Sequence, residues 1–91
     1  SFACLGSRFP TGTRIELDTM TQVEQAEDIL RDRGYIQYRV RHHGDLCRIE
    51  IDPTDFDKLI HERGELVKAI KSTGYRFVTL DLSGYSMGSS A

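Results

Sequence analysis

The stretch that decides the fold is Tyr38-Arg39-Val40-Arg41-His42-His43-Gly44-Asp45-Leu46-Cys47-Arg48-Ile49-Glu50-Ile51. Apolar and polar residues alternate in both halves, which is the period of a β-strand, and we expect strands over Ile36–His42 and Leu46–Asp52. Gly44-Asp45 suits a two-residue hairpin turn with glycine first. That turn pairs Val40 with Ile49 and places the apolar side chains on one face, whereas a slip of one residue would mix the faces.

Helical periodicity on both sides of this hairpin predicts two helices. The first runs from about Thr19 to Arg33, ends before Gly34, and carries an apolar stripe made of Met20, Val23, Ala26 and Leu30. The second begins at Asp52-Pro53, with proline at its first position, and ends at Gly74. Gly64 is expected to kink or divide it.

A last strand is predicted over Arg76–Leu82, and Thr13–Leu17 is a candidate for a further short strand. With that strand the order is βαββαβ, the split-βαβ pattern, and without it the order is αββαβ. Either order predicts one α+β domain over residues 13–84, related to ferredoxin-like folds, with two helices on one face of a small antiparallel sheet. Residues 1–12 read as a loop and 85–91 as a flexible tail.

Length and composition limit the class of protein. The 91 residues are 38% hydrophobic with a net charge of -2, which allows one domain with a modest core. The balance of charge argues against coating nucleic acid by bulk charge, and no apolar run is long enough to span a membrane. Two cysteines make no disulfide framework, so a cytoplasmic location is expected. Because the chain begins at Ser1, we expect a fragment of something longer.

The polar face of the hairpin is the first candidate site. Its register places Arg39 opposite Glu50 and Arg41 opposite Arg48, and like charges directly opposite are destabilising. Arginine offers a fork of donors that matches phosphate or carboxylate. Three guanidiniums on one face are therefore a candidate anion site, and the alternative is a solvated face with splayed arginines.

Three more side chains stand out. Glu27 lies on the apolar stripe of the first helix, so it either has a buried partner or extends to solvent from the edge of the stripe. Cys4 is near Ser7 and Arg8, where a cation would favour the reactive thiolate, and the alternative is an ordinary loop thiol. Cys47 alternates with core residues and is expected to be a buried small hydrophobe.

The adjacent pair His42-His43 does not predict a metal centre. Neighbouring strand residues point to opposite faces, so the two rings cannot share one ion. Cys47 opposite His42 would give two ligands, which is too few for a structural zinc site. We therefore expect no metal site in this chain.

Three segments together resemble a known family. They are Cys4-Leu5-Gly6-Ser7-Arg8-Phe9-Pro10-Thr11-Gly12-Thr13-Arg14-Ile15, the hairpin Tyr38–Glu50, and Gly74-Tyr75-Arg76-Phe77-Val78-Thr79-Leu80-Asp81-Leu82-Ser83-Gly84-Tyr85. In order and spacing they are similar to the C-terminal half of the ATP-dependent sacrificial sulfur transferases, the LarE family of PP-loop ATP pyrophosphatases. The resemblance covers nearly the whole chain.

The resemblance implies an activity for a longer enzyme. Its N-terminal PP-loop domain, with ATP and Mg²⁺, would adenylate a carboxylate of a pyridinium dicarboxylate mononucleotide. A cysteine would displace AMP, give up its sulfur and remain as dehydroalanine. The product becomes the nickel-pincer cofactor of lactate racemase. This chain has no PP-loop motif, so alone it is expected to be inactive.

The resemblance also implies roles for particular residues. Cys4 corresponds to the sulfur donor, and the phosphate of the substrate would be held by Arg39, Arg41, Ser7 and Arg8. Glu27 and Glu50 correspond to acidic residues near the site. An iron–sulfur cluster occurs in some relatives but is not indicated here, and a homo-oligomer is expected.

A different class of function stays open beside this one. The domain could be a ferredoxin-like module of another PP-loop enzyme that binds a nucleotide or RNA, or that serves oligomerisation. RNA binders of this kind use aromatic side chains interleaved on the sheet. Tyr38 faces the core in the predicted register, which makes nucleic acid an unexpected partner.

Overall fold

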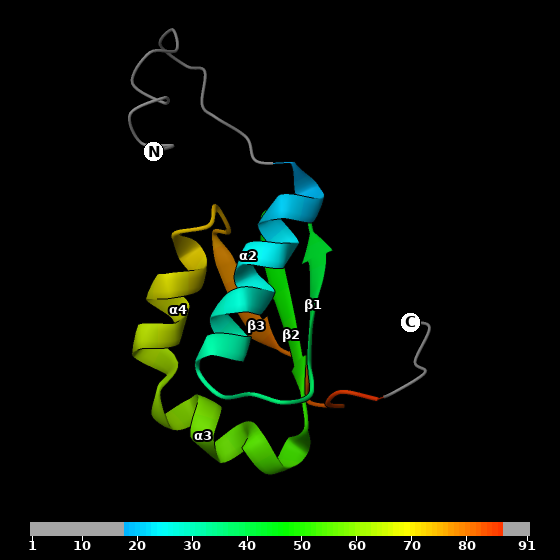
Figure 1. Cartoon of the computed structure of the whole chain (residues 1–91), viewed down its shortest axis with the longest axis vertical. Helices are drawn as coiled ribbons and strands as arrows, with labels where there is room; N and C mark the ends of the chain where they lie inside the picture. Colours follow the sequence, from blue (N-terminus) through cyan, green and yellow to red (C-terminus); the bar gives the residue numbers. More distant parts are fainter. Residues whose placement is uncertain (1–17, 87–91) are drawn as a thin grey trace, which may run out of the picture.

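The computed structural model describes residues 18–86 (Figure 1). In chain order its elements are α2 (Thr19–Asp32), β1 (Tyr38–His43), β2 (Leu46–Ile51), the 3-10 turn η1 (Pro53–Asp55), α3 (Phe56–His61), α4 (Arg63–Lys71) and β3 (Phe77–Leu80). The predicted loop over residues 1–12 and the candidate strand Thr13–Leu17 lie outside the described residues.

The hairpin has the predicted register. Val40 lies opposite Ile49, and the other apolar pairs follow the same alternation. Gly44 has a φ of 61°, a left-handed conformation that glycine adopts at little cost. The first strand begins at Tyr38 rather than at Ile36, which is 85% exposed. Alternation therefore placed Ile36 on the core face wrongly, because the segment before Tyr38 does not pair with β2.

The sheet is mixed, which corrects the predicted antiparallel sheet. Its order is β1-β2-β3, with β1 antiparallel and β3 parallel to β2. The helical segment between β2 and β3 returns the chain to the same end of the sheet, so β3 runs in the direction of β2. Because β2 and β3 are direct neighbours, the βαβ unit is not split within the described residues. The α+β class is confirmed.

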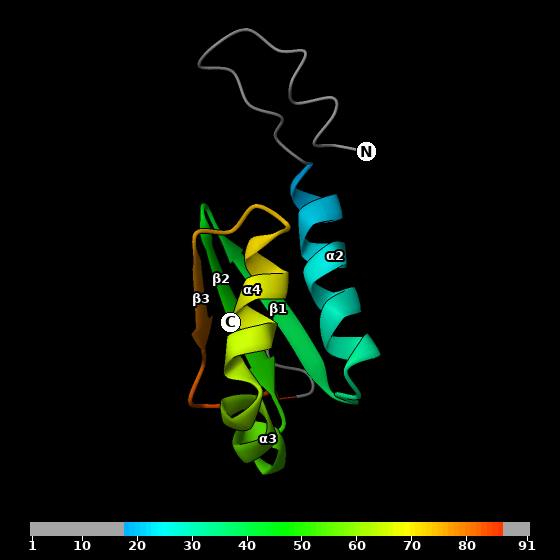
Figure 2. The same cartoon turned by 90° about the vertical axis from the view of Figure 1, so that its left-hand side faces the viewer.

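The helices cover one face of the sheet, as predicted, and Figure 2 shows α2 and α4 on the same side. They bury a single core of eleven residues, comprising Ala26, Leu30, Tyr35, Val40, Cys47, Ile49, Ile51, Leu59, Leu66, Ile70 and Tyr75. Met20 of the predicted stripe is instead exposed in the first turn of α2. The other sheet face therefore carries the alternate side chains of the strands, which are polar except for Leu46 and Phe77.

The second predicted helix is divided, and the break lies at Glu62, two residues before Gly64. The Glu62 carboxylate accepts hydrogen bonds from Tyr35 Oη at 2.5 Å and from Arg33 Nη2 at 2.9 Å. The Tyr35 hydroxyl, followed by Arg33, lowers the pKa of Glu62. These contacts tie the helix junction to the end of α2.

In residues 18–86, no helix is both long enough and apolar enough to cross a membrane.

Candidate functional site

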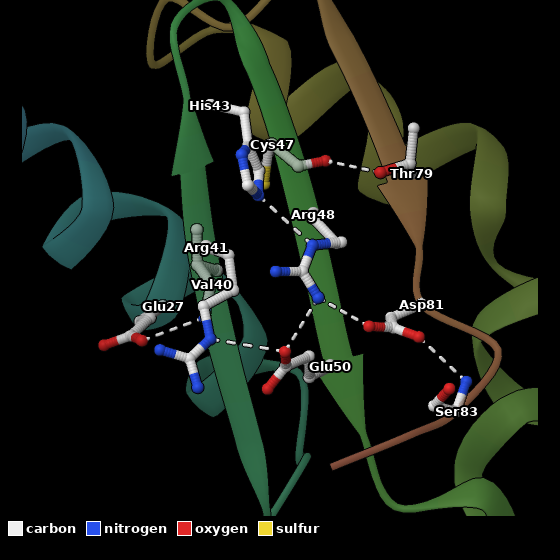
Figure 3. A network of polar contacts seen from close by, with 10 residues as sticks. All are labelled: Glu27, Val40, Arg41, His43, Cys47, Arg48, Glu50, Thr79, Asp81 and Ser83. Carbon is white, nitrogen blue, oxygen red and sulfur yellow. Dashed lines mark hydrogen bonds and ion pairs between the residues drawn. The ribbon is translucent and has the colours of Figure 1, made fainter. Parts of the chain in front are cut away.

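The candidate site is the sheet face turned away from the helices. It carries seven polar side chains from three strands and the segment after β3, namely Arg39, Arg41, His43, Arg48, Glu50, Thr79 and Asp81. Figure 3 shows six of these seven above the sheet, all except Arg39. The predicted pairings of Arg39 with Glu50 and of Arg41 with Arg48 are both present.

Glu50 is the centre of this face. It is only 6% exposed, and its Oε2 accepts from Arg41 Nε at 3.2 Å and from Arg48 Nη1 at 3.0 Å (Figure 3). One carboxylate oxygen thus lies between two cations that would otherwise repel each other. Hydrogen bonds between ionised groups are about twice as strong as neutral ones, so this bridge fixes both guanidiniums on the sheet.

Arg48 is held from a second side by the segment after β3. Its Nη1 lies 2.5 Å from Asp81 Oδ2, and its Nε donates to His43 Nε2 at 3.2 Å. The backbone N–H of Ser83, followed by Arg48, lowers the pKa of Asp81. Asp81 is therefore ionised at neutral pH, and Arg48 is engaged by protein groups at three points.

In the described part of the chain, Arg39 and Arg41 keep N–H donors that have no acceptor. Arg41 uses Nε for Glu50, and within residues 18–86 its two terminal nitrogens have no hydrogen-bond acceptor. Arg39 pairs with no carboxylate in the same range, and its guanidinium lies 5.8 Å from the centre of the Tyr85 ring. A further anion on this face would therefore meet two guanidiniums that have unused N–H donors within residues 18–86, and guanidinium N–H groups are the donors that bind phosphate.

Glu27 lies on α2 beside the outer edge of β1. Its Oε2 accepts the backbone N–H of Val40 at 3.0 Å (Figure 3). An unpaired N–H on a strand edge is a site for unwanted pairing with another chain. The observed partner of Glu27 is thus this N–H rather than a guanidinium. The carboxylate of Glu27, which lies on the otherwise apolar stripe of α2, therefore covers the edge of the sheet.

Cys47 is fully buried, as predicted for a small hydrophobe. Burial, with a further contribution from Glu27, raises the pKa of its thiol to about 12. His42 faces the same side and its Nδ1 lies 2.8 Å from Tyr75 Oη, whereas His43 contacts Arg48 on the polar face. Among residues 18–86 no group of His, Cys, Asp and Glu could hold a metal ion.

The predicted donor Cys4 and its neighbours Ser7 and Arg8 lie outside the described residues. An iron–sulfur cluster needs thiolate ligands, and Cys47, the free cysteine within residues 18–86, is a poor candidate because its thiol is buried and protonated.

Sequence reasoning missed Asp81 and Tyr85 as parts of this face. Both follow β3, and their position depends on the parallel pairing of β3 with β2. The signal that could have found Asp81 is alternation, since it follows Phe77 and Thr79 at intervals of two residues. Alternation alone does not show which face of the sheet Asp81 joins, because that also depends on the strand with which β3 pairs.

Comparison with known proteins shows relatives but no matching family model. An uncharacterised protein of Synechocystis is 42% identical over 87 residues, which are 93% of this chain and 32% of that protein. The pyridinium-3,5-bisthiocarboxylic acid mononucleotide synthase of Lactiplantibacillus plantarum is 38% identical over 84 residues, which are 92% of this chain and 30% of the synthase. An uncharacterised protein of Methanocaldococcus jannaschii is 33% identical over 82 residues, which are 90% of this chain and 32% of that protein.

The chain spans about a third of the length of these curated relatives. Nearly all of it is thus related in sequence to one part of a mononucleotide synthase.

Proposed function

We propose that this chain is the C-terminal substrate and sulfur-donor domain of an ATP-dependent sulfur transferase. The enzyme would convert a pyridinium dicarboxylate mononucleotide to its thiocarboxylate form for synthesis of the nickel-pincer cofactor of lactate racemase. The observation that carries the proposal is the 38% identity over 84 residues with a synthase named for that product.

The arginine face fits the chemistry of such a substrate. A mononucleotide carries a phosphate, and guanidinium forks bind phosphate with geometric specificity. Within residues 18–86, Arg39 and Arg41 keep unused donors, while Glu50 holds Arg41 and Arg48 in place and Asp81 holds Arg48. A site whose donors are already ordered loses less entropy when a ligand binds. In this account Glu50 positions the arginines and need not touch the substrate.

Cys4 is proposed as the sulfur donor, and the chemistry requires a thiolate. A separate PP-loop domain of the same longer chain would bind ATP and Mg²⁺ and form the acyl adenylate. The Cys4 thiolate then attacks the acyl carbon, the new C–S bond forms, and AMP leaves with the electrons of the broken C–O bond. A base removes the Cα proton of residue 4, the Cβ–S bond breaks, and sulfur leaves on the product while dehydroalanine remains.

The structure of Cys47 supports this choice of cysteine. Cys47 lies beneath the sheet with a pKa raised to about 12, so at neutral pH it is a thiol without access to a substrate on the polar face. Cys4 is the remaining cysteine of the sequence. Ser7 and Arg8 follow it closely, and we propose that they help to hold the same phosphate.

Substrate binding tests the arginine face. We would titrate the chain with the pyridinium dicarboxylate mononucleotide and follow backbone amide shifts by NMR in the wild type, Arg39→Gln and Arg31→Gln. Arg31 is a matched control because it loses the same charge on α2, where it pairs with Asp28. We expect shifts on β1 and β2, binding about tenfold weaker in Arg39→Gln, and no change in Arg31→Gln. Equal binding by all three proteins, or no shift at millimolar ligand, would overturn this assignment.

A further inference from the structure

The segment Asp81–Tyr85, which we call the strap, crosses the end of the sheet after β3 (Figure 1). The backbone N–H of Asp81 donates to Ile49 O at 2.9 Å, and that of Tyr85 donates to Ile51 O at 2.8 Å. Both ends of the strap are therefore fixed to β2, and its last residue lies beside the beginning of β1.

The path of the strap depends on Gly84. Its φ is 81°, and a Cβ atom there would lie 2.9 Å from Pro53 Cγ and 3.2 Å from Ile51 O. A side chain at this position would be strained and would push the strap away from Pro53. The close approach at Gly84 thus fixes the path of the backbone immediately before Tyr85.

The ring of Tyr85 lies near the guanidinium of Arg39. The Arg39 guanidinium carbon lies 5.8 Å from the ring centre, within the range of a cation–π contact. Glu50, which is opposite Arg39 in the register, directs its carboxylate to Arg41 and Arg48 instead. Within residues 18–86, the interaction found for the Arg39 guanidinium is therefore the one with the ring of Tyr85.

A ring contact has a consequence that an ion pair would not have. A guanidinium has five N–H donors, and the contact of Arg39 with the Tyr85 ring supplies no oxygen acceptor, so it occupies none of them with an ion pair. A carboxylate partner would occupy two of them. The contact with Tyr85 therefore leaves the N–H groups that bind an anion unused.

We propose that Tyr85 is a positioning residue for Arg39, holding its guanidinium ready for the phosphate of the mononucleotide. This inference rests on the proposed function for the identity of the ligand, but the ordering of Arg39 is a property of the free protein. An arginine side chain loses much rotamer freedom when it binds. Part of that loss has already occurred when Tyr85 holds the side chain.

The first measurement is the relaxation of the Arg39 Nε–Hε signal in the free chain, compared between the wild type, Tyr85→Phe and Tyr85→Leu. We expect Arg39 to be ordered in the wild type and in Tyr85→Phe, which keeps the ring, and mobile in Tyr85→Leu. Gly84→Ala should also mobilise Arg39 with the ring intact. Leu82→Ala is the matched control, because Leu82 is an exposed residue of the same strap.

The second measurement is binding of the pyridinium dicarboxylate mononucleotide by the same proteins. We expect binding about three- to tenfold weaker in Tyr85→Leu and Gly84→Ala, and wild-type binding in Tyr85→Phe and Leu82→Ala. If the Arg39 side chain is equally ordered in the wild type and in Tyr85→Leu, the proposal is overturned, whatever the binding measurement shows. If Arg39 becomes mobile in Tyr85→Leu but the wild type does not bind the mononucleotide, the positioning role is supported and the proposed function is rejected.

Discussion

Arg41 and Arg48 face each other across the hairpin, and one oxygen of Glu50 accepts a hydrogen bond from each of them. The sequence places two cations directly opposite, an arrangement that costs stability unless an anion lies between them. The protein supplies that anion itself from two residues along β2. Among the residues that the structure describes, the terminal nitrogens of Arg41 have no acceptor, so the bridge holds Arg41 and leaves these donors for a ligand.

Removal of the bridging charge should destabilise the fold. Glu50→Gln leaves two guanidiniums opposite each other with a neutral amide between them. Because Glu50 is buried but both arginines are about a quarter exposed, we expect a loss of roughly 1–3 kcal/mol in the free energy of unfolding. Urea unfolding at pH 7 measures this change.

Glu65→Gln is the matched control for that experiment. Glu65 also pairs with an arginine, Arg33, but its side chain is 81% exposed. An exposed ion pair contributes little, so we expect a change below about 1 kcal/mol. If Glu50→Gln costs no more than Glu65→Gln, the bridge does not hold the arginine face together.

Glu27 should protect the edge of the sheet. Its carboxylate accepts the Val40 N–H, so Glu27→Ala leaves that group without its partner, whereas Glu27→Gln keeps an oxygen acceptor. We expect faster hydrogen exchange of the Val40 amide in Glu27→Ala and near wild-type exchange in Glu27→Gln. Unchanged exchange in both variants would mean that this carboxylate does not cap the edge.

The pKa of Glu62 should depend on Tyr35. The pKa of this carboxyl is lowered, first by the Tyr35 hydroxyl and then by Arg33. A lowered pKa in the folded state stabilises the protein above the ordinary carboxyl pKa, and this stability is lost as pH falls through the folded-state value. Tyr35→Phe should therefore raise the pKa of Glu62 and weaken the fold at neutral pH more than in acid.

An NMR titration of the carboxyl carbons checks this prediction. Asp81 is the internal control, because its pKa is lowered by Ser83 and Arg48 and not by Tyr35. We expect the Glu62 titration to move up in Tyr35→Phe and the Asp81 titration to stay in place. An unmoved Glu62 titration would contradict the hydrogen bond from Tyr35.

Cys47 should be inert in the folded chain. With a pKa raised to about 12 by burial, its thiolate fraction at pH 8 is about a thousandth of that of an ordinary thiol. We expect peptide mapping after iodoacetamide treatment to show Cys47 unlabelled in the native protein and labelled in guanidinium. Equal labelling in both conditions would show that this thiol is accessible.

Local signals predicted the register of the hairpin, although they began its first strand two residues too early, at Ile36. Alternation over two adjacent strands and a glycine-first turn determine the register, and no distant residue is needed. The same reasoning could not fix β3, because a strand of four residues does not reveal its partner. The parallel pairing, and with it Asp81 beside Arg48, depends on contacts far apart in sequence.

The sequence also could not predict which partner each side chain contacts, even where the strand register was predicted correctly. The pairing of Arg39 with Glu50 was predicted, yet the carboxylate turns to Arg41 and Arg48. Cα register does not determine which rotamer a long side chain adopts. Tyr85 was assigned to a flexible tail, because the Gly and Ser residues around it carry no periodic signal. Its backbone hydrogen bond to Ile51 is a long-range contact.

The most direct test of the account is the intact mass of the longer protein to which this chain is proposed to belong. The mass would be recorded before and after incubation with ATP, Mg²⁺ and the pyridinium dicarboxylate mononucleotide. We predict the loss of one hydrogen sulfide, mapped by peptide sequencing to Cys4, together with formation of thiocarboxylate product. An unchanged protein mass with product formed, or a loss mapped to Cys47, would contradict Cys4 as the sacrificial donor.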